Sequence, residues 1–326
     1  MRNWLYNVWY HNAPMGWVLW PLEMLFRAVA ALRRLTFRWS IQREQAAPVP
    51  VIIVGNISVG GSGKSPLVAW LTNAAQERGL TPAIISRGYG GDHSGEPLRV
   101  TEHVAAADCG DEALMLFQHT GAIVFVSRHR VAAARAAAAA GANVIISDDG
   151  LQHYHLARDV EIAVVDARVE HGNGHCLPRG PLREPISRLQ DCDLVVYASL
   201  PAGDSRIGYR LQNTHAVNAQ TGGQEPLEAF AQTSVHALAG IGHPQRFFEA
   251  LRAHGLNVEG HAIADHALAP ERVLHPADEL PVLMTAKDAV KYTSLTGRHW
   301  IVPASVELSE ESRAALLAVL PLTDAQ

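Results

Sequence analysis

This chain of 326 residues has few lysines and no net positive charge. Lys64, Lys287 and Lys291 are its only lysines, and the formal net charge is −5 at pH 7. A protein that binds nucleic acid needs a basic surplus to meet the phosphate backbone, and this chain has none. We therefore expect no nucleic-acid partner.

Cysteine is rare as well. Cys109, Cys176 and Cys192 are too few and too dispersed for a disulfide framework or a zinc cluster. This usage favours a reducing, cytoplasmic setting.

The sequence also lacks a long apolar run. Residues 3–22 contain no Asp, Glu, Lys or Arg, but they include asparagines and prolines, and Glu23 and Arg27 interrupt the next stretch. A spanning helix needs about twenty mostly apolar residues. The start carries only Arg2 and no compact apolar core before a small-residue cleavage site, so we expect no signal peptide.

The first 43 residues are instead rich in aromatic and basic side chains. Five of the seven tryptophans lie here, at positions 4, 9, 17, 20 and 39. Arginines follow at positions 27, 33, 34, 38 and 43. This composition is typical of a segment that lies in a membrane interface with its arginines toward anionic headgroups. The alternative is an N-terminal helix packed on the next domain, with its tryptophans in the core.

A glycine-rich turn follows an apolar β-branched run within Val49–Pro66. We expect a buried strand over 51–54 and a helix whose first turn contains Pro66. The intervening loop consists of Ser58, Val59, Gly60, Gly61, Ser62, Gly63, Lys64 and Ser65. Its glycines can turn backbone N–H groups onto an anion, Lys64 can reach β/γ-phosphates and Ser65 can hold Mg²⁺.

This phosphate-binding loop is a variant. The pattern G-x-x-x-x-G-K-[ST] has glycine where this chain has Ser58. The alternative interpretation is a strand-to-helix turn with a stray lysine.

Short apolar runs alternate with helical patterns after the loop. We expect further strands over 82–86, 122–127, 143–147, 161–166 and 193–198. Such alternation predicts an α/β fold with a doubly wound, mostly parallel sheet. The expected organisation is a membrane-interface segment over 1–43, a phosphate-loop domain over 44–205, a linker over 206–232 and a smaller α/β domain over 233–326.

Polar residues at strand ends are the candidates for chemistry, because ligands of such sheets bind beyond the carboxyl ends of the strands. Asp148 and Asp149 follow the strand expected over 143–147 and resemble the Mg²⁺-supporting aspartate of phosphate-loop enzymes, although a capped Asp-Gly turn is the alternative. From the residues alone, Asp111 is a helix N-cap. Asp265 and His266 alone indicate capping or surface positions.

Eight motifs together are more specific than the loop. They are, in order, VGGSGKSP, SRGYGG, GDE, SDDGLQH, RGPLRE, AGIGHP, ADH and TAKDAVK. From about Val49 to Lys291 the chain resembles the tetraacyldisaccharide 4′-kinase family. The resemblance implies an ATP- and Mg²⁺-dependent kinase that phosphorylates the 4′-hydroxyl of an acylated glucosamine disaccharide 1-phosphate and forms lipid IVA. It also implies a peripheral or monotopic position on the cytoplasmic face of the inner membrane, and no obligate protein partner.

The resemblance assigns roles to matching residues. Lys64 and Ser65 would hold the ATP phosphates and Mg²⁺. Asp148 and Glu184 would support the metal, with Asp149 beside it.

The acceptor side of the expected site joins two domains. Asp111 would be the general base, paired with His266, which reverses the N-cap interpretation. Ser86, Tyr89 and Arg183 would line the nucleotide and lipid-phosphate region. Because Asp111 and His266 fall in different expected domains, we expect closure between domains to assemble the base.

A different class of function also fits the loop and the N-terminal segment. A membrane-associated ATPase or GTPase switch, or an assembly factor, would transfer phosphate to water alone.

Overall fold

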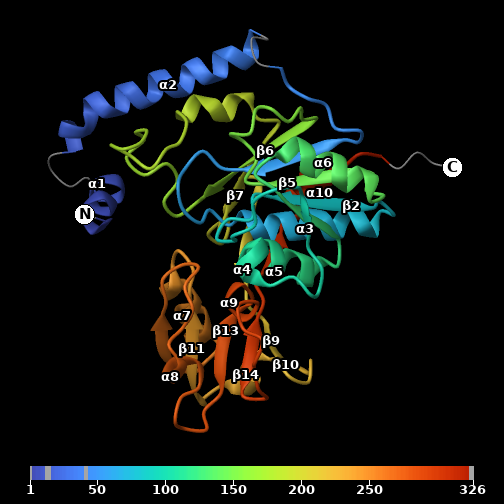
Figure 1. Cartoon of the computed structure of the whole chain (residues 1–326). Coiled ribbons are helices and arrows are strands. Elements are labelled where there is room, and N and C mark those ends of the chain that lie inside the picture. Colours follow the sequence, from blue (N-terminus) through green and yellow to red (C-terminus); the bar gives the residue numbers. More distant parts are fainter. Residues whose placement is uncertain (1, 12–15, 40–42, 323–326) are drawn as a thin grey trace.

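The computed structural model describes residues 2–11, 16–39 and 43–322. Met1 and residues 12–15, 40–42 and 323–326 lie outside this description, so the expected interface segment over 1–43 is described only in part. The described chain forms a large upper lobe, a small lower lobe and two N-terminal helices (Figure 1).

The large lobe is built on a nine-stranded sheet with the order β15-β8-β7-β6-β1-β5-β2-β4-β3. Its strands are β1 (Val51–Gly55), β2 (Pro82–Ser86), β3 (Leu98–Arg99), β4 (Ile123–Val126), β5 (Val144–Asp148), β6 (Val160–Asp166), β7 (Leu194–Ala198), β8 (Gly208–Gln212) and β15 (Ser305–Leu308). β1 lies between β5 and β6 and runs parallel to both. The edge strands β3 and β15 are antiparallel to their neighbours. The predicted doubly wound, mostly parallel sheet is confirmed.

Helices cover both faces of this sheet, which explains why its strands are continuous apolar runs. On one face, Leu67 and Leu71 of α3 (Lys64–Glu77) pack in the same core as Ile52 of β1. α5 (Asp111–Thr120) and α10 (Glu310–Ala318) join that layer. On the other face, the alanines of α6 (Arg130–Ala139) share a core with Ile53. Successive residues of β1 thus enter opposite cores.

The small lobe has a six-stranded sheet with the order β10-β9-β14-β13-β11-β12. Its strands are β9 (His215–Asn218), β10 (Gln224–Pro226), β11 (Ser234–Ala239), β12 (Asn257–Ala262), β13 (Val282–Thr285) and β14 (His299–Val302). Its α-helices are α7 (Pro244–Ala253), α8 (Glu271–Leu274) and α9 (Ala286–Ala289). Phe247 and Phe248 of α7 pack against β11 in one core. The carboxyl ends of β11 and β13 point toward the large lobe (Figure 1).

The short elements complete the described chain. They are α4 (Ala106–Cys109) and the 3₁₀ helices η1 (Gly16–Leu19), η2 (Ile186–Asp191) and η3 (Leu227–Phe230).

Sheet membership differs from the expected division of the chain. The stretch expected as a linker over 206–232 contains β8, β9 and β10, and residues 305–318 return to the large lobe as β15 and α10. β10 is exposed along its length, and the last three residues of β8 are exposed. Such strands carry polar residues and lack the apolar run that reveals a buried strand.

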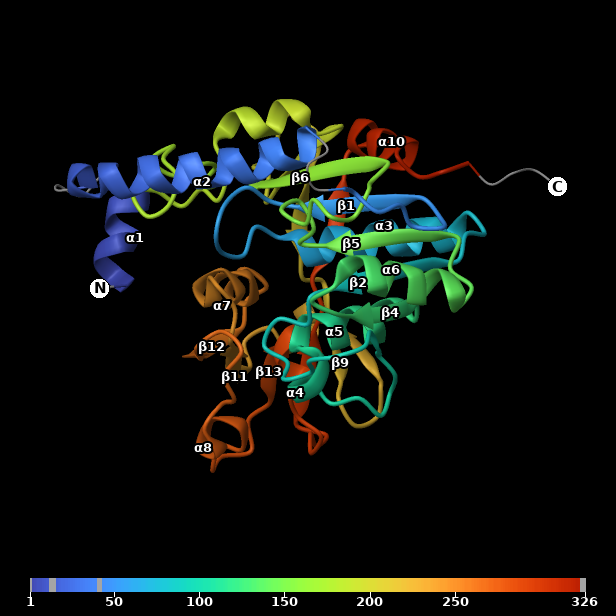
Figure 2. The same ribbon diagram turned by 45° about the horizontal axis from the view of Figure 1, so that its top comes forward.

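The N-terminal segment forms α1 (Arg2–Tyr10) and α2 (Trp20–Arg38), and α2 extends along the outside of the large lobe (Figures 1 and 2). Large apolar side chains are exposed on and beside α2: Trp17, Val18, Trp20, Leu22, Leu25, Val29, Leu32 and Trp39. The alternative that placed the tryptophans in a core is wrong for Trp17, Trp20 and Trp39, which are 71%, 53% and 64% exposed. Within residues 2–11, 16–39 and 43–322, no helix is both long enough and apolar enough to cross a membrane.

Glu23 attaches α2 to the large lobe. Its carboxylate is fully buried and accepts hydrogen bonds from the Cys176 backbone N–H at 3.1 Å and from Arg179 at 3.5 Å. His175 Nδ1 lies 3.2 Å from the same carboxylate. A buried carboxylate with several donors fixes the position of the helix that carries it. The acidic residue that interrupts the apolar stretch is therefore a buried point of attachment.

We predict that Glu23→Ala loosens α2, because the substitution leaves buried donors without their acceptor at a cost of about 1–3 kcal/mol. Hydrogen exchange of the α2 amides should become faster than in the wild type. Arg27→Ala is the matched control, since Arg27 is half exposed and lies 3.8 Å from Glu23. Equal exchange in the Glu23→Ala and wild-type proteins would contradict this attachment.

Candidate functional site

The phosphate-binding loop connects β1 to α3 at the carboxyl edge of the large sheet. Gly60 and Gly63 have φ values of 101° and 84°, a region that favours glycine. A Cβ on Gly63 would lie 2.9 Å from the hydroxyl of Tyr209 on β8, so a side chain is excluded there. A Cβ on Gly60 or Gly61 would meet no described atom within 4 Å. The loop therefore has open space at Gly60 and Gly61, and it leads into the N-terminus of α3, where the first N–H groups of a helix can bind an anion.

Lys64 and Arg183 both contact Asp149. Lys64 Nζ lies 3.5 Å from Asp149 Oδ1 and donates to Asn56 Oδ1 at 3.2 Å, and Arg183 donates to Asp149 Oδ2 at 3.1 Å. Burial acts to raise the pKa of Asp149, but the two cations outweigh it and hold the pKa below its usual value. Asp149 thus keeps Lys64 at the loop.

Asp148 is a different kind of carboxylate. It ends β5, is 2% exposed, and its Oδ1 has no hydrogen-bond partner among the described residues. Burial, with a smaller contribution from Glu112, raises the pKa of Asp148 to about 7 against the opposing effect of Lys64. A buried carboxylate oxygen without a partner suits a hard divalent cation, which takes oxygen ligands. The site therefore fits Mg²⁺.

Glu184 lies in the same region, but its oxygens already have partners. Gln152 Nε2 donates to Glu184 Oε2 at 2.9 Å and to the Asn56 carbonyl at 3.1 Å. The Tyr154 hydroxyl donates to Glu184 Oε1. Burial and the adjacent Glu184 raise the pKa of Tyr154 to about 12, so this donor keeps its proton. The predicted role of Glu184 as a metal ligand stays a prediction.

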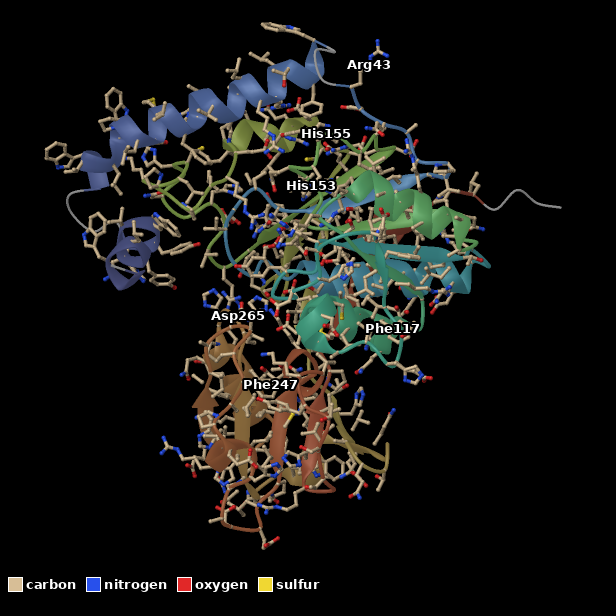
Figure 3. The ribbon with its side chains drawn as sticks, in the orientation of Figure 1. Arg43, Phe117, His153, His155, Phe247 and Asp265 are labelled. Carbon is tan, nitrogen blue, oxygen red and sulfur yellow. The ribbon has the colours of Figure 1, made fainter. Side chains whose placement is uncertain are left out.

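Asp111 and His266 meet across the two lobes. His266 Nδ1 lies 2.9 and 3.0 Å from the two oxygens of Asp111, which begins α5 and is 5% exposed. Lys291 Nζ lies 3.8 Å from Asp111 Oδ2. The Tyr89 ring stands edge-on to His266 at 5.0 Å between centroids. Residues far apart in the sequence thus form one polar cluster, and Asp265 beside it lies between the lobes (Figure 3).

Ser86 and Arg183, the other residues predicted to line the site, differ in their surroundings. Ser86 is buried at the carboxyl end of β2, whereas Arg183 is bonded to Asp149. Their contact with a substrate stays a prediction, as does that of Tyr89, which is 65% exposed.

Several residues of the site were missed by the sequence analysis. Lys287 donates to Glu112 Oε1 at 3.0 Å and to Asp265 Oδ1 at 2.9 Å, which joins the lobes beside Asp111. Burial acts to lower the pKa of Lys287, but Glu112 and Asp111 hold it above its usual value. The scarcity of lysine was the available signal, because all three lysines lie at this site.

Arg130 and Asp166 were also missed. Arg130 is buried and donates to the Asp148 carbonyl at 3.0 Å, and no sequence motif marks it. Asp166 ends β6 and accepts from Arg246 of α7 at 2.7 Å. The rule that pointed to Asp148 at a strand end applies equally to Asp166.

A cavity of about 240 Å³ borders the loop between the lobes and α1. Its lining includes Tyr6, Trp9, Tyr10, Ser58, Asp166 and His243. The N-terminal helix, the phosphate-binding loop and the small lobe therefore share one concave surface.

We predict that Asp148→Asn changes the pH dependence of stability in the absence of divalent metal. The folded-state pKa of about 7 lies above the ordinary 3.8, so the wild type loses stability as pH rises through this interval. The variant cannot ionise there. The free energy of unfolding of both proteins is measured in urea at pH 5 and at pH 8. From pH 5 to pH 8, the variant should become more stable relative to the wild type. If the free energy of unfolding of the variant minus that of the wild type stays constant or decreases from pH 5 to pH 8, the raised pKa is contradicted.

The chain is similar to known proteins over nearly all of its length. The family model for tetraacyldisaccharide-1-P 4′-kinase matches residues 15–321. The tetraacyldisaccharide 4′-kinase of Nitrosococcus oceani is 43% identical over 96% of this chain and 93% of its own length. That of Stenotrophomonas maltophilia is 45% identical over 92% and 91%.

A solved structure agrees with these relatives. It is the apo form of LpxK from Aquifex aeolicus in complex with ATP, with 25% identity and a TM-score of 0.77. The similarity covers 93% of this chain and 98% of that one. The chain belongs to the tetraacyldisaccharide 4′-kinase family.

Proposed function

We propose that this protein transfers the γ-phosphoryl group of ATP to the 4′-hydroxyl of a tetraacylated glucosamine disaccharide 1-phosphate, forming lipid IVA. The observation that carries the proposal is the Asp111–His266 pair, in which the small lobe brings His266 to an aspartate of the lobe that also holds the phosphate-binding loop. The charge of Glu112, next to Asp111, is close enough to raise the pKa of Asp148. This contribution supports the proposal that the candidate base and the candidate metal ligand serve one site.

The donor would lie on the loop and the start of α3. Phosphoryl transfer requires in-line positioning and neutralisation of charge on the phosphate oxygens. The loop N–H groups and Lys64 supply both, and Lys64 is already directed there by Asn56 and Asp149. Ser65, Asp148 and Glu184 would hold Mg²⁺, which when bound would neutralise charge on the phosphates.

The acceptor would be activated by Asp111. A carboxylate within hydrogen-bond reach of the sugar hydroxyl can orient it and take its proton during transfer. His266 orients this carboxylate through Nδ1, and the Glu112 backbone N–H holds Asp111 Oδ1 at 2.9 Å. Asp111 is thus the proposed general base, and His266 is its positioning residue.

The exposed apolar side chains of α2 would rest on the cytoplasmic face of the inner membrane, where the lipid acceptor lies. Leu22, Leu25, Val29 and Leu32 are spaced along one side of the helix and are all exposed. Binding at the interface strengthens with the apolar area that is buried. The protein would then reach its substrate without a soluble carrier.

The two lobes would move relative to each other during catalysis. The chain passes between them through two short links, from β8 to β9 and from β14 to β15. Polar contacts cross the gap, as in the pairs Lys287–Glu112 and Arg246–Asp166. Polar contacts and short links are compatible with a hinge that assembles Asp111 and His266.

The decisive experiment follows labelled phosphate. The protein is incubated with γ-labelled ATP, Mg²⁺ and the acylated disaccharide 1-phosphate, and the products are separated by thin-layer chromatography. We expect label in a lipid product. Label found only in inorganic phosphate would favour the rival function, a membrane-associated nucleotide hydrolase.

We predict that Asp111→Ala lowers kcat by about 10²–10⁴-fold, because the general base is removed. The affinity for ATP should be largely kept, since Asp111 is not part of the loop. Asp108→Ala is the matched control, because Asp108 is an exposed carboxylate three residues earlier. An unchanged kcat in the Asp111→Ala protein would refute the proposed role.

A further inference from the structure

A second polar cluster lies in the small lobe, on the edge strand β12 and its neighbour β11. It consists of His236 on β11 and of Glu259 and His261 on β12. The two strands are parallel, and His236 is opposite Glu259 in their register. A Cβ on Gly260 would meet Phe248 of α7 at 2.7 Å, so Glu259 and His261 lie on the face away from α7.

The polar atoms of the three side chains converge. His236 Nδ1 lies 3.0 Å from His261 Nε2. Carboxylate oxygens of Glu259 lie 3.7 Å from His236 Nδ1 and 3.8 Å from His261 Nε2. Ligands about 2.0–2.1 Å from a tetrahedral Zn²⁺ are separated from one another by roughly 3.3 Å. The two histidine nitrogens and the Glu259 carboxylate, whose two oxygens make these two contacts, therefore lie close to the spacing of three corners of such a site.

Asp278 fixes the form of His236 that can act as a ligand. His236 is 4% exposed, and its Nε2 lies 3.0 Å from Asp278 Oδ2. An ionised carboxylate can only accept, so Nε2 carries the hydrogen, and in the neutral ring Nδ1 then presents its lone pair to the cluster. A carboxylate behind the far nitrogen is the usual support of a metal-bound histidine.

We propose that His236, Glu259 and His261 bind a divalent transition ion of the Zn²⁺ class, with water in the fourth position. Two imidazole nitrogens and one carboxylate oxygen are ligands that such ions take. The ion would link the edge strand β12 to β11. Gly240, which follows the carboxyl end of β11, is four residues beyond His236, or about 13 Å along the strand. The ion would therefore have a structural role, separate from phosphoryl transfer.

Cobalt titration of the full-length protein tests the site, because Co²⁺ reports four-coordinate N/O binding by its visible absorption. We expect the wild type to bind one Co²⁺ with this absorption, which Zn²⁺ then displaces. His261→Gln and Glu259→Gln should each weaken binding at least tenfold. Both replace side chains that are more exposed than His236, at 22% and 68% against 5%, so the variants should keep the fold.

Three further variants make the result specific. His254→Gln removes another His–Glu pair of the same lobe, at 2.8 Å from Glu228, and should bind Co²⁺ as the wild type does. His266→Gln removes a histidine from the other candidate cluster, Asp111, Asp265 and His266, and should also leave the signal unchanged. Asp278→Asn should weaken binding about 10–100-fold through the loss of support to His236.

Thermal unfolding supplies a second measurement that does not depend on kinase activity. Zn²⁺ should raise the Tm of the wild type but not that of His261→Gln, since a ligand stabilises only the folded protein that binds it. Equal Co²⁺ affinity in the wild type and His261→Gln would overturn the proposal. So would the absence of the absorption from the wild type, which would leave His236 and His261 as a hydrogen-bonded pair.

Discussion

The contact between Asp111 and His266 connects the two lobes, and the proposed activation of the acceptor depends on it. Each partner is fixed by its own sheet: Asp111 begins α5, which packs in the core of the large lobe, and His266 follows β12 of the small sheet. His266 adopts a φ of 62°, which a non-glycine residue rarely does without support from its surroundings. The hydrogen bond to Asp111, the Tyr89 ring and Gly90 supply that support, and a Cβ on Gly90 would lie 3.2 Å from His266 Nδ1.

The two adjacent aspartates, Asp148 and Asp149, have different surroundings and therefore different properties. Asp149 is held ionised by Lys64 and Arg183, whereas Asp148 is buried with a partner-free oxygen and a pKa near 7. The positive φ of Asp149, 50°, turns its side chain away from the direction that β5 gives to Asp148. One backbone turn thus produces a fixed anion that orients Lys64 and a second carboxylate suited to a cation.

The sequence predicted those parts of the fold that depend on local pattern. Strands such as β1 and β5 are buried on both faces and are therefore apolar throughout, and the glycine loop has its own signature. β8 and β15 were not found, because they are partly exposed and pair over a long sequence separation.

The pairing of Asp111 with His266 was predicted only from the resemblance to a family, since no local pattern links residues in different lobes. The contacts of Lys287 and the burial of Glu23 were missed for the same physical reason: a charged residue is normally exposed, and only tertiary structure supplies the partners that make its burial favourable.

The two links between the lobes also affect how the chain is assembled. The small lobe is inserted between β8 and β15, so the large sheet is not complete until β15 has emerged from the ribosome after the small lobe. Until then β8 is an open edge, and unpaired strand edges are where nascent chains aggregate. The segment of β15 and α10 also contributes Ser312, whose hydroxyl accepts a hydrogen bond from the Gly208 backbone N–H at 3.0 Å. Next to Gly208 on β8, the Tyr209 hydroxyl donates to the carbonyl of Gly63 in the phosphate-binding loop. A chain truncated before β15 would therefore leave exposed the strand that supports its own nucleotide site.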